Sequence, residues 1–323
     1  MRIGTGQIGK CIRFTLDLAE DSGDAPRSVV GKFPSDDPTS RKTGVELRNY
    51  IKEVSFYRDL QARLSIRSPR CYYAAIVGEG PEFSLILEDI AAAVPGDQLA
   101  GCSTRVARAA VLELVGLHAP SWDNASFRGI DWLGGPSADF VAMVRRLYET
   151  MLLGFLARYG SHLRRDEIEI IEQVASSAGP PFEYPAAPLA LVHVDYRLDN
   201  MLIDDRIDPP RVTVVDWQSI TLGNPLTDVA YFLGAGLLPD ERRPCEQGIV
   251  GEYHDALTSA GITDYPYEHC WDDYRRGVFA GFAVTVIASM LVQETERGNQ
   301  MFIAMARRHA RHALDLGSEE FLR

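Results

Sequence analysis

One short segment carries the residue types and the spacing best suited to chemistry. His193 is followed by Asp195, Asn200 comes five residues after that aspartate, and a β-branched run then leads to Asp216. Phosphoryl transfer from a nucleotide needs one carboxylate near the acceptor hydroxyl and separate oxygen donors for the hard Mg²⁺ ions that bridge the phosphates. On the two arms of a hairpin, Asn200 and Asp216 would converge on the metal while Asp195 faces the acceptor.

Each of these residues also has an ordinary structural interpretation when it is taken alone. Asp195 and Asn200 are residue types that are common in turns, and Asp216 could simply end a strand. Their joint spacing before a β-branched strand favours the functional interpretation. His193 is the exception, because we expect it to support the loop by hydrogen bonding rather than to titrate in the reaction.

A glycine-rich segment opens the chain. Gly4, Gly6 and Gly9 match the pattern G-x-G-x-x-G, which alone is a weak signal shared with dinucleotide-binding folds. The dinucleotide version follows a strand and opens a helix, whereas here a predicted strand follows Gly9. The arrangement favours a loop over nucleotide phosphates, where missing side chains let backbone N–H groups approach the ligand.

A lysine and a glutamate form the second candidate pair. Lys32 ends a short predicted strand, and Glu53 follows twenty-one residues later in a helical pattern. An ion pair between them would hold the ammonium over the α- and β-phosphates of a nucleotide. Glu46, nearer the start of the helix, is the competing partner. The structural alternatives are a solvated lysine at a strand end and a surface charge on a helix.

The elements that must position these residues fall into two parts. In the first ninety or so residues, alternating apolar residues and turn signals predict a small sheet that carries one helix. The predicted strands are Cys11–Leu16, Ser28–Phe33, Ala74–Val77 and Phe83–Leu87, and the helical pattern runs from Val45 to Leu60. This part would carry the glycines and the Lys32 pair.

The second part is mostly helical. Helical patterns cover about residues 106–117, 137–159, 165–176, 242–260, 271–294 and 301–316. The exception is the block that ends at Asp216, where the runs Met201–Ile203 and Val212–Val215 predict a hairpin. This hairpin would bring Asn200 and Asp216 together.

The composition is that of a globular protein. The 323 residues are 46% hydrophobic, and 33 Lys and Arg against 45 Asp and Glu give a formal charge of −12, which disfavours a nucleic-acid partner. Five scattered cysteines without a CxxC pair indicate free thiols in a reducing cytoplasm. The sequence shows neither the apolar core of a signal peptide nor an apolar run long enough to span a membrane. We therefore expect a cytoplasmic protein without membrane contact.

Taken together, these residues resemble the aminoglycoside phosphotransferase and choline kinase-like family of small-molecule kinases, from Gly4 through Leu233. The resemblance implies an α+β, bilobal protein kinase-like fold. A small β-rich N-lobe over residues 1–90 would bind the nucleotide, with a hinge at about residues 85–92. A larger, mostly helical C-lobe over residues 91–323 would carry the catalytic loop and the acceptor site.

The resemblance also implies roles for single residues. Asp195 would be the catalytic base, and Asn200 and Asp216 would be the Mg²⁺ ligands. Arg197 would neutralise the transferring phosphoryl group, with an exposed loop arginine as the ordinary alternative.

Three further positions take their roles from the same resemblance. The hinge backbone from Glu88 to Ile90 would meet the nucleotide base. Asp228 would brace the catalytic loop from a following helix.

Three departures from the family pattern set further expectations. Val194 replaces the glycine usual between the histidine and the aspartate, which would crowd the loop but leave its polar groups in place. Only eleven residues separate Asp216 from Asp228, which leaves no room for a phosphorylatable activation loop, so we do not expect protein substrates. The chain starts at the glycine segment, so we expect the strand that leads into it to be almost wholly missing, at a cost in nucleotide affinity.

The sequence thus predicts an ATP- or GTP-dependent, Mg²⁺-requiring kinase that phosphorylates a hydroxyl of a small molecule. A pseudokinase-like binding module without turnover is the alternative. A metal-dependent hydrolase would need further closely spaced ligands, whereas the seven histidines are scattered. The acceptor, the choice of nucleotide and the oligomeric state stay open.

A group of acidic and aromatic residues in the second part could receive a cationic acceptor, although a solvated helix face and core packing explain it more simply. The group consists of Asp240, Glu241, Glu246, Glu252, Tyr253, Asp255, Tyr265, Tyr267, Glu268, Trp271, Asp272, Asp273 and Tyr274.

Overall fold

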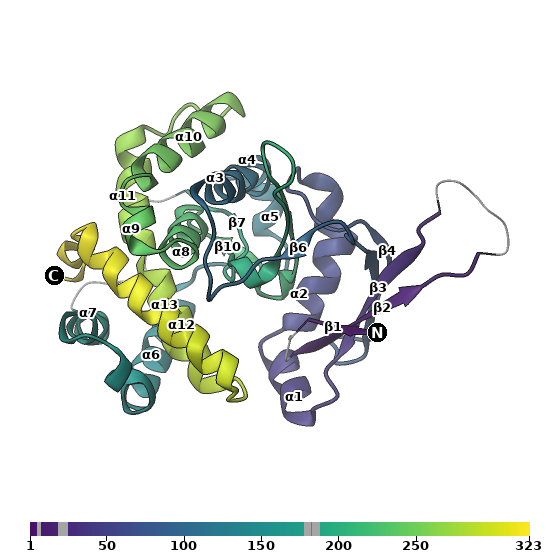
Figure 1. Ribbon diagram of the computed structural model, residues 1–323, viewed down its shortest axis with the longest axis horizontal. Coiled ribbons are helices and arrows are strands. Elements are labelled where there is room, and N and C mark those ends of the chain that lie inside the picture. The colour runs from purple at the N-terminus through teal and green to yellow at the C-terminus, as the bar shows by residue number, and fades with distance from the viewer. Residues whose placement is uncertain (5–7, 19–24, 178–181, 183–187) are drawn as a thin grey trace.

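The protein folds into two lobes, as a computed structural model shows (Figure 1). The structure describes residues 1–4, 8–18, 25–177, 182 and 188–323. The N-lobe comprises strands β1–β5 with helices α1 and α2, and the C-lobe comprises helices α3–α13 with the short strands β6–β10. This arrangement confirms the predicted α+β, bilobal fold with a small sheet and a larger helical body.

The N-lobe is built on one antiparallel sheet. Its strands are β1 (Arg2–Ile3), β2 (Gly9–Thr15), β3 (Ser28–Pro34), β4 (Cys71–Ile76) and β5 (Phe83–Glu88), in the order β1-β2-β3-β5-β4. The four predicted strands are confirmed with shifted ends. The strand expected to be almost wholly missing is present as the two residues of β1, which pair with Cys11 and Ile12 of β2.

The predicted N-lobe helix is interrupted. Helix α1 (Pro38–Glu46) begins at Pro38 after Asp37, whose side chain caps the first turn by accepting from the Ser40 N–H at 2.7 Å. Arg48 then adopts a left-handed conformation with φ of 59° and separates α1 from α2 (Asn49–Ser55). A π-helical turn over Phe56–Leu60 and a 3₁₀ turn over residues 61–63 continue α2. The break places the glutamates of α1 and α2 in different surroundings.

The C-lobe packs around one buried helix, α8, of which every residue except Thr227 is buried. An apolar helix of this kind needs neighbours on all sides, and α11, α12 and α13 pack against it (Figure 1). The helices are α3 (Thr104–Glu113), α4 (Val115–Ser121), α5 (Ala125–Arg128), α6 (Ala138–Tyr159), α7 (Arg165–Ser176), α8 (Leu226–Gly236), α9 (Pro239–Arg242), α10 (Glu246–Ser259), α11 (Tyr267–Gly277), α12 (Phe279–Leu291) and α13 (Glu296–Asp315).

The helix predicted over residues 271–294 is two helices, α11 and α12, that meet at Val278. A Cβ atom at Gly277 would lie 2.8 Å from the carbonyl oxygen of Leu226, so only glycine lets the end of α11 approach α8 this closely. The pattern predicted over 242–260 corresponds to α10, which begins four residues later at Glu246, and its first residue belongs to the preceding short helix α9. The apolar periodicity between 271 and 294 was right, but it continues across the break at Val278.

Short strands surround the predicted catalytic segment, from His193 to Asp216. The predicted hairpin is confirmed as β8 (Met201–Asp204) and β9 (Arg211–Val214). Three further strands, β6 (Val94–Pro95), β7 (Ala190–Val192) and β10 (Thr221–Gly223), are too short to show periodicity in the sequence. Strand β6 pairs with β8, and β7 pairs with β10, so the segment is tied to the C-lobe before and after the predicted catalytic residues.

In the described part of the chain, no helix has both the length and the apolar character needed to cross a lipid bilayer.

Candidate active site

The loop between β7 and β8 is held by a carboxylate from α8. The backbone N–H groups of His193 and Val194 donate to the two oxygens of Asp228 at 2.6 and 2.9 Å. The His193 ring hydrogen-bonds the Val215 carbonyl oxygen through Nε2 at 3.1 Å. The expected bracing by Asp228 and the supporting role of His193 are both confirmed.

Val194 occupies a backbone conformation that favours glycine. Its φ is 72°, which is a rare value for a β-branched residue and costs about 1–2 kcal/mol. The bonds from the loop backbone to Asp228 help to hold the residue there. The expected crowding thus takes the form of backbone strain, and the polar groups of the loop keep their partners.

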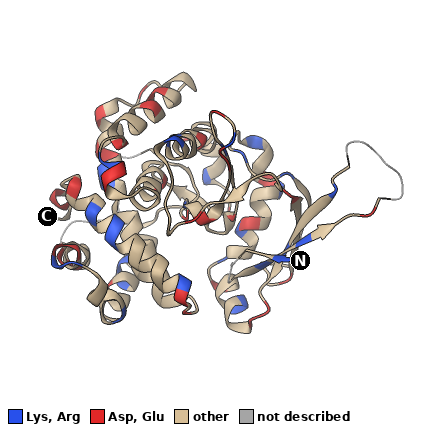
Figure 2. Cartoon of the chain, in the orientation of Figure 1, with Lys and Arg blue, Asp and Glu red and all other residues tan. Residues whose placement is uncertain are grey.

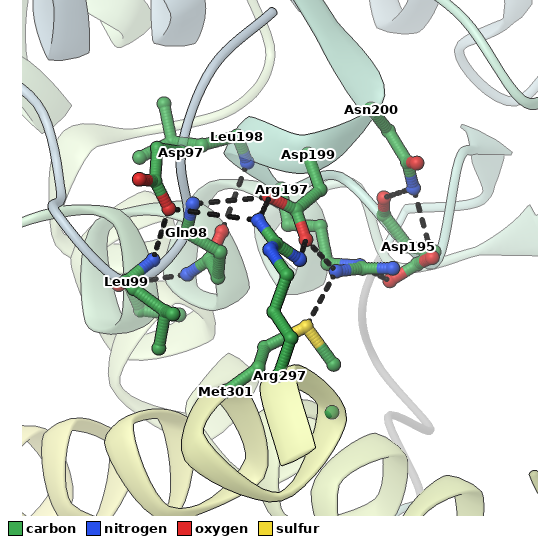
Figure 3. Close-up of polar contacts among 12 residues, drawn as sticks. Asp97, Gln98, Leu99, Asp195, Arg197, Leu198, Asp199, Asn200, Arg297 and Met301 are labelled. Carbon is green, nitrogen blue, oxygen red and sulfur yellow. Dashed lines mark hydrogen bonds and ion pairs between the residues drawn. The ribbon is translucent and has the colours of Figure 1, made fainter. Parts of the chain in front are cut away.

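Asp195 is surrounded by donors from the C-lobe (Figure 3). Its Oδ1 accepts from Arg197 Nε at 2.8 Å and from the Tyr231 hydroxyl at 3.1 Å, and its Oδ2 accepts from Asn200 Nδ2 at 2.8 Å. Asn200 Nδ2 also donates to the Asp195 carbonyl oxygen at 2.9 Å. With its amino group between two acceptors, the amide is oriented so that its oxygen is directed away from Asp195 and can serve another partner.

Lys32 joins the N-lobe to the catalytic segment. Its ammonium lies 2.6 Å from Glu53 Oε1 and 2.8 Å from Asp216 Oδ1. The competing partner, Glu46, is exposed and lies 3.7 Å from Lys42. Of the two glutamates considered from the sequence, the structure therefore pairs Glu53 with Lys32, and it adds Asp216 as a second partner.

Aromatic and amide contacts hold the two carboxylates of this cluster in place. The rings of Phe56 and Trp217 stack with their centroids 3.8 Å apart, which joins the end of α2 to the residue after Asp216. Asn49 at the start of α2 donates to the Gln218 carbonyl oxygen at 2.9 Å. Asp216 itself has a φ of 67°, a left-handed conformation that aspartate tolerates better than most residues.

The charges in the cluster are not balanced. Burial alone would lower the pKa of Lys32, but the Asp216 and Glu53 carboxylates outweigh it and hold that pKa well above its usual value. Burial raises the pKa of Glu53 against the opposing effect of Lys32. Burial also acts to raise the pKa of Asp216, but the ammonium outweighs it and the pKa is lowered. One ammonium therefore serves two carboxylates.

The oxygen donors expected to bind metal lie at adjacent points of the hairpin. The Val215 N–H donates to the Asn200 carbonyl oxygen at 3.0 Å, so Asn200 lies opposite the residue before Asp216. The Asp216 side chain is 24% exposed, whereas Glu53 is 2% exposed. An amide oxygen, a carboxylate and excess negative charge fit a hard cation such as Mg²⁺.

The glycine segment adjoins Lys32. A Cβ atom at Gly9 would lie 3.2 Å from both Lys32 Cε and the Phe33 carbonyl oxygen, so glycine gives the lysine stem room beside β2. Gly4 has a φ of 72°, which glycine adopts readily. Gly6 lies outside the described residues. Contact of this segment with phosphates remains a prediction.

The predicted hinge begins where β5 ends. The Glu88 N–H donates to the Arg70 carbonyl oxygen at 2.8 Å, and the Glu88 carboxylate accepts from the Arg70 N–H at 3.1 Å. The Ile90 carbonyl oxygen accepts from the Ala93 N–H at 3.1 Å in the turn that follows. Contact of Glu88 or Ile90 with a nucleotide base remains a prediction.

Asp89, between these two residues, was not singled out from the sequence. Its carboxylate accepts from Arg13 Nη2 at 2.9 Å and from the Ser28 hydroxyl at 2.7 Å. Since Arg13 lies on β2 and Ser28 on β3, Asp89 ties the predicted hinge to the sheet. A lone aspartate after a strand carries no sequence signal for this role.

Arg197 is an internal residue of the site rather than an exposed loop arginine. Its side chain is 19% exposed and contacts three groups: Asp195, Asp199 Oδ2 at 2.9 Å, and Met301 Sδ at 2.9 Å (Figure 3). Burial would lower the pKa of Arg197, but the neighbouring carboxylates, Asp195 first, outweigh it and raise the pKa. The guanidinium thus stays charged beside the proposed catalytic base.

The first turn of α13 reaches the same loop. Arg297 donates to both oxygens of Asp199 at 2.9 and 3.0 Å and lies 3.6 Å from Asp97 (Figure 3). Asp199 Oδ1 also accepts from the Gln98 N–H at 3.1 Å. These contacts join the segment after the hinge, the catalytic loop and the last long helix.

Sequence reasoning missed the residues that support Asp195 from other elements. Met301 and Arg297 lie about one hundred residues further along the chain, and no local pattern connects them to the loop. Tyr231 did have a signal, because it follows Asp228 by three residues in a helix and therefore lies on nearly the same face. An aromatic hydroxyl beside the bracing aspartate could have been noted.

The acidic group considered for a cationic acceptor lies mostly on α9–α11, on the side of the C-lobe away from the sheet (Figures 1 and 2). Glu246 is buried against Arg242, and Asp273 accepts from the Tyr265 hydroxyl at 2.6 Å. Tyr253 is fully buried in the core. These contacts favour the simpler interpretation, in which some of these residues pack in the core of the C-lobe and the others lie on its solvated surface.

A catalytic loop in a helical lobe, joined by a strand lysine to a small antiparallel sheet, defines the protein kinase-like class of fold. The profile described as "Phosphotransferase enzyme family" matches residues 23–263 of the chain. The chain therefore belongs to this family of phosphotransferases, as its motifs indicated. A search of curated proteins found no match to the sequence.

Three solved structures share the fold. A GDP complex of aminoglycoside 2'-phosphotransferase-IIIa is 13% identical with a TM-score of 0.59, and the match covers 96% of this chain and 91% of that one. Choline kinase from Cryptosporidium parvum Iowa II is 10% identical with a TM-score of 0.60, covering 99% and 88%. An ethanolamine kinase from Plasmodium vivax is 11% identical with a TM-score of 0.55, covering 95% and 81%.

Proposed function

We propose that the protein transfers the γ-phosphoryl group of ATP or GTP to a hydroxyl of a small molecule. The observation that carries this proposal is the ammonium of Lys32, which joins Glu53 of the N-lobe to Asp216 beside the catalytic loop. Membership of the phosphotransferase family supports the reaction class. The aminoglycoside, choline and ethanolamine kinases that share the fold support a small-molecule acceptor.

The proposed chemistry at the acceptor rests on Asp195. Its Oδ2 accepts the proton of the acceptor hydroxyl as the hydroxyl oxygen attacks the γ-phosphorus, and the bond to the leaving nucleoside diphosphate breaks in line. Arg197 beside Asp195 supplies positive charge near the transferring group. Because the transition state is loose, the protein contributes chiefly position and charge.

The proposed nucleotide site lies between the lobes. Lys32 would bind the α- and β-phosphates, the segment from Gly4 to Gly9 would cover them, and the backbone from Glu88 to Ile90 would meet the base. Asn200 and Asp216 would hold Mg²⁺, which neutralises phosphate charge when bound. In this proposal, residues 1–90 bind the nucleotide, with the hinge at about residues 85–92, and residues 91–323 bind the acceptor. A GDP complex among the structures that share the fold makes GTP as reasonable a donor as ATP.

The test is a screen for nucleotide consumption. Wild-type protein is incubated with Mg-ATP or Mg-GTP and a panel of amino alcohols, sugars and aminoglycosides, and release of nucleoside diphosphate is measured. We expect an acceptor that raises this release well above hydrolysis by water. We also expect Asp195→Asn to lower turnover with that acceptor by roughly 10³-fold while nucleotide binding persists. Full turnover by Asp195→Asn would overturn the assignment of the base.

A further inference from the structure

Helix α8 contacts the catalytic loop at two points that lie one turn apart. Asp228 binds the backbone N–H groups of the loop, and Tyr231, three residues later, donates its hydroxyl to Asp195 Oδ1 at 3.1 Å. Tyr231 is 1% exposed, so its hydroxyl has no access to bulk water. The first contact fixes where the loop lies, and the second contacts the carboxylate itself.

The donors around Asp195 are distributed unevenly between its two oxygens. Oδ1 accepts from both Arg197 Nε and the Tyr231 hydroxyl, which uses the two lone pairs of that oxygen. Among the described residues, Oδ2 accepts from Asn200 Nδ2 alone and keeps one lone pair available. The Asp195 side chain is 22% exposed, so part of the carboxylate can be reached from outside.

A histidine of α13 packs against the Tyr231 ring. The imidazole of His309 stacks on it, with ring centroids 5.3 Å apart and an angle of 12° between the planes. His309 is fully buried, and a Cβ atom at Gly281 or Gly234 would lie 2.3 or 2.9 Å from its Nδ1, so the ring fills a slot lined by glycine. The Tyr231 ring therefore has little freedom to move away from Asp195.

Tyr231 stays a hydrogen-bond donor under ordinary conditions. Burial, and then the Asp195 carboxylate, raise the pKa of its phenol well above the usual value. Burial lowers the pKa of His309 to about 3, so the stacked imidazole is neutral and brings no competing charge. The interaction with Asp195 is therefore made by a permanently protonated hydroxyl.

We propose that Tyr231 is a positioning residue that occupies Asp195 Oδ1 and thereby presents Oδ2 to the acceptor hydroxyl, an inference that rests on the proposed function. Without the Tyr231 hydroxyl, Arg197 alone holds Oδ1. The carboxylate can then rotate, and a smaller share of molecules presents the free lone pair of Oδ2 in line with the nucleotide.

The experiment compares Tyr231→Phe with Tyr148→Phe, using Mg-ATP and the acceptor that the screen selects. The matched control removes an equally buried hydroxyl, which donates to the Ile171 carbonyl oxygen between α6 and α7. Phenylalanine keeps the ring stacked on His309, so the melting temperature checks that Tyr231→Phe is folded. We expect Tyr231→Phe to lower kcat about tenfold, because it removes one hydrogen bond to a charged group. The KM for ATP and the KM for the acceptor should change little. The control should keep the wild-type kcat.

A second comparison separates positioning from a general structural effect. If Tyr231 acts through the Asp195 carboxylate, Tyr231→Phe should cause no further loss in an Asp195→Asn background. An unchanged kcat in Tyr231→Phe, or an equal loss in both backgrounds, would overturn the inference. Failure of the proposed function gives a different result, because the screen would then find no acceptor that raises the release of nucleoside diphosphate above hydrolysis by water.

Discussion

Two of the ion clusters in the described part of the chain differ in charge balance. In the cluster between the lobes, Lys32 binds both Glu53 and Asp216. In the C-lobe cluster, Arg242 binds Glu246 at 2.5 Å and also binds Asp315, to which Arg243 adds a second guanidinium. The first cluster has one cation for two carboxylates, whereas in the second two guanidinium groups contact Glu246 and Asp315, and the exposed Asp240 also pairs with Arg243.

The two clusters also differ in what they connect. Arg242 is 1% exposed, and its partners lie on α10 and α13, so the whole cluster belongs to the C-lobe. Lys32 joins β3 and α2 to the catalytic hairpin, and Asp216 keeps a quarter of its surface accessible. A balanced cluster within one lobe fits a role in holding helices together. A cluster between the lobes with more carboxylates than cations fits the binding of a cation that a ligand brings.

Removing the lysine tests this difference most severely. We expect Lys32→Met to lower kcat/KM by about 10²–10³-fold, because the phosphates lose a fixed positive charge. Lys10→Met is the control on the neighbouring strand, since among the described residues Lys10 pairs with the exposed Asp36. Steady-state kinetics with Mg-ATP checks the prediction, and near-equal losses in the two variants would contradict it.

Removing the arginine should have the opposite consequence. Arg242→Met leaves the buried Glu246 and the partly accessible Asp315 without their main partner, which should lower the free energy of unfolding by about 3 kcal/mol. The kcat of the folded variant should stay close to the wild-type value. Urea unfolding measures this loss of stability. The control is Arg165→Met, which breaks an exposed pair with Glu169 and should change the free energy of unfolding by less than about 1 kcal/mol. A large fall in kcat without loss of stability would break the comparison.

The buried groups of the C-lobe should also make its stability depend on pH. Folding lowers the pKa of His309 from 6.5 to about 3, chiefly by burial. The unfolded chain therefore takes up the proton first, so the stability associated with neutral His309 is complete above pH 6.5 and falls as the pH approaches 3. Between pH 6.5 and 5 this group should lower the free energy of unfolding by about 2 kcal/mol.

Substitution of His309 provides the measurement. The difference in unfolding free energy between wild-type protein and His309→Phe should change by about 2 kcal/mol between pH 7 and pH 5, in favour of the variant at the lower pH. His162→Phe, which alters an exposed histidine, should leave the wild-type dependence unchanged. Parallel curves for wild type and His309→Phe would contradict the expected effect of burial.

The smallest effect is expected at the contact between α13 and the catalytic loop. Arg297→Gln loses the hydrogen bonds to both carboxylate oxygens of Asp199, and Asp199 in turn contacts Arg197. We therefore expect kcat to fall about three- to tenfold, with little change in the KM for the nucleotide. Arg311→Gln, on the same helix but paired with Asp166, is the control. Identical kinetics for the two variants would show that the contact does not position the loop.

The parts of the site that lie close together in the chain could be predicted from the sequence. Asp195, Asn200 and Asp216 occupy one segment, where spacing along a loop and hairpin translates directly into proximity. The partner of Lys32 was harder to choose, because both glutamates fit a continuous helix. Only the left-handed Arg48 between α1 and α2 separates their surroundings.

Contacts between distant elements could not be predicted in this way. Tyr231 and Arg297 contact the loop because α8 and α13 pack beside it, and His309 of α13 contacts Tyr231. Helix packing of this kind leaves no local pattern. Helix breaks were missed for a related reason. Apolar periodicity continues through Val278, whereas the break depends on the close approach of Gly277 to α8.

The most direct test asks whether a nucleotide brings a cation to Asp216. The melting temperature is measured for wild type and Asp216→Asn with ATP, with and without Mg²⁺, and again with a chelator. We predict that wild type rises by several degrees only when Mg²⁺ accompanies ATP, because ligand binding stabilises the folded state. In Asp216→Asn, this dependence on Mg²⁺ should be lost. An equal rise for wild type in the presence of chelator would contradict the proposal that the excess negative charge at Asp216 is a metal site.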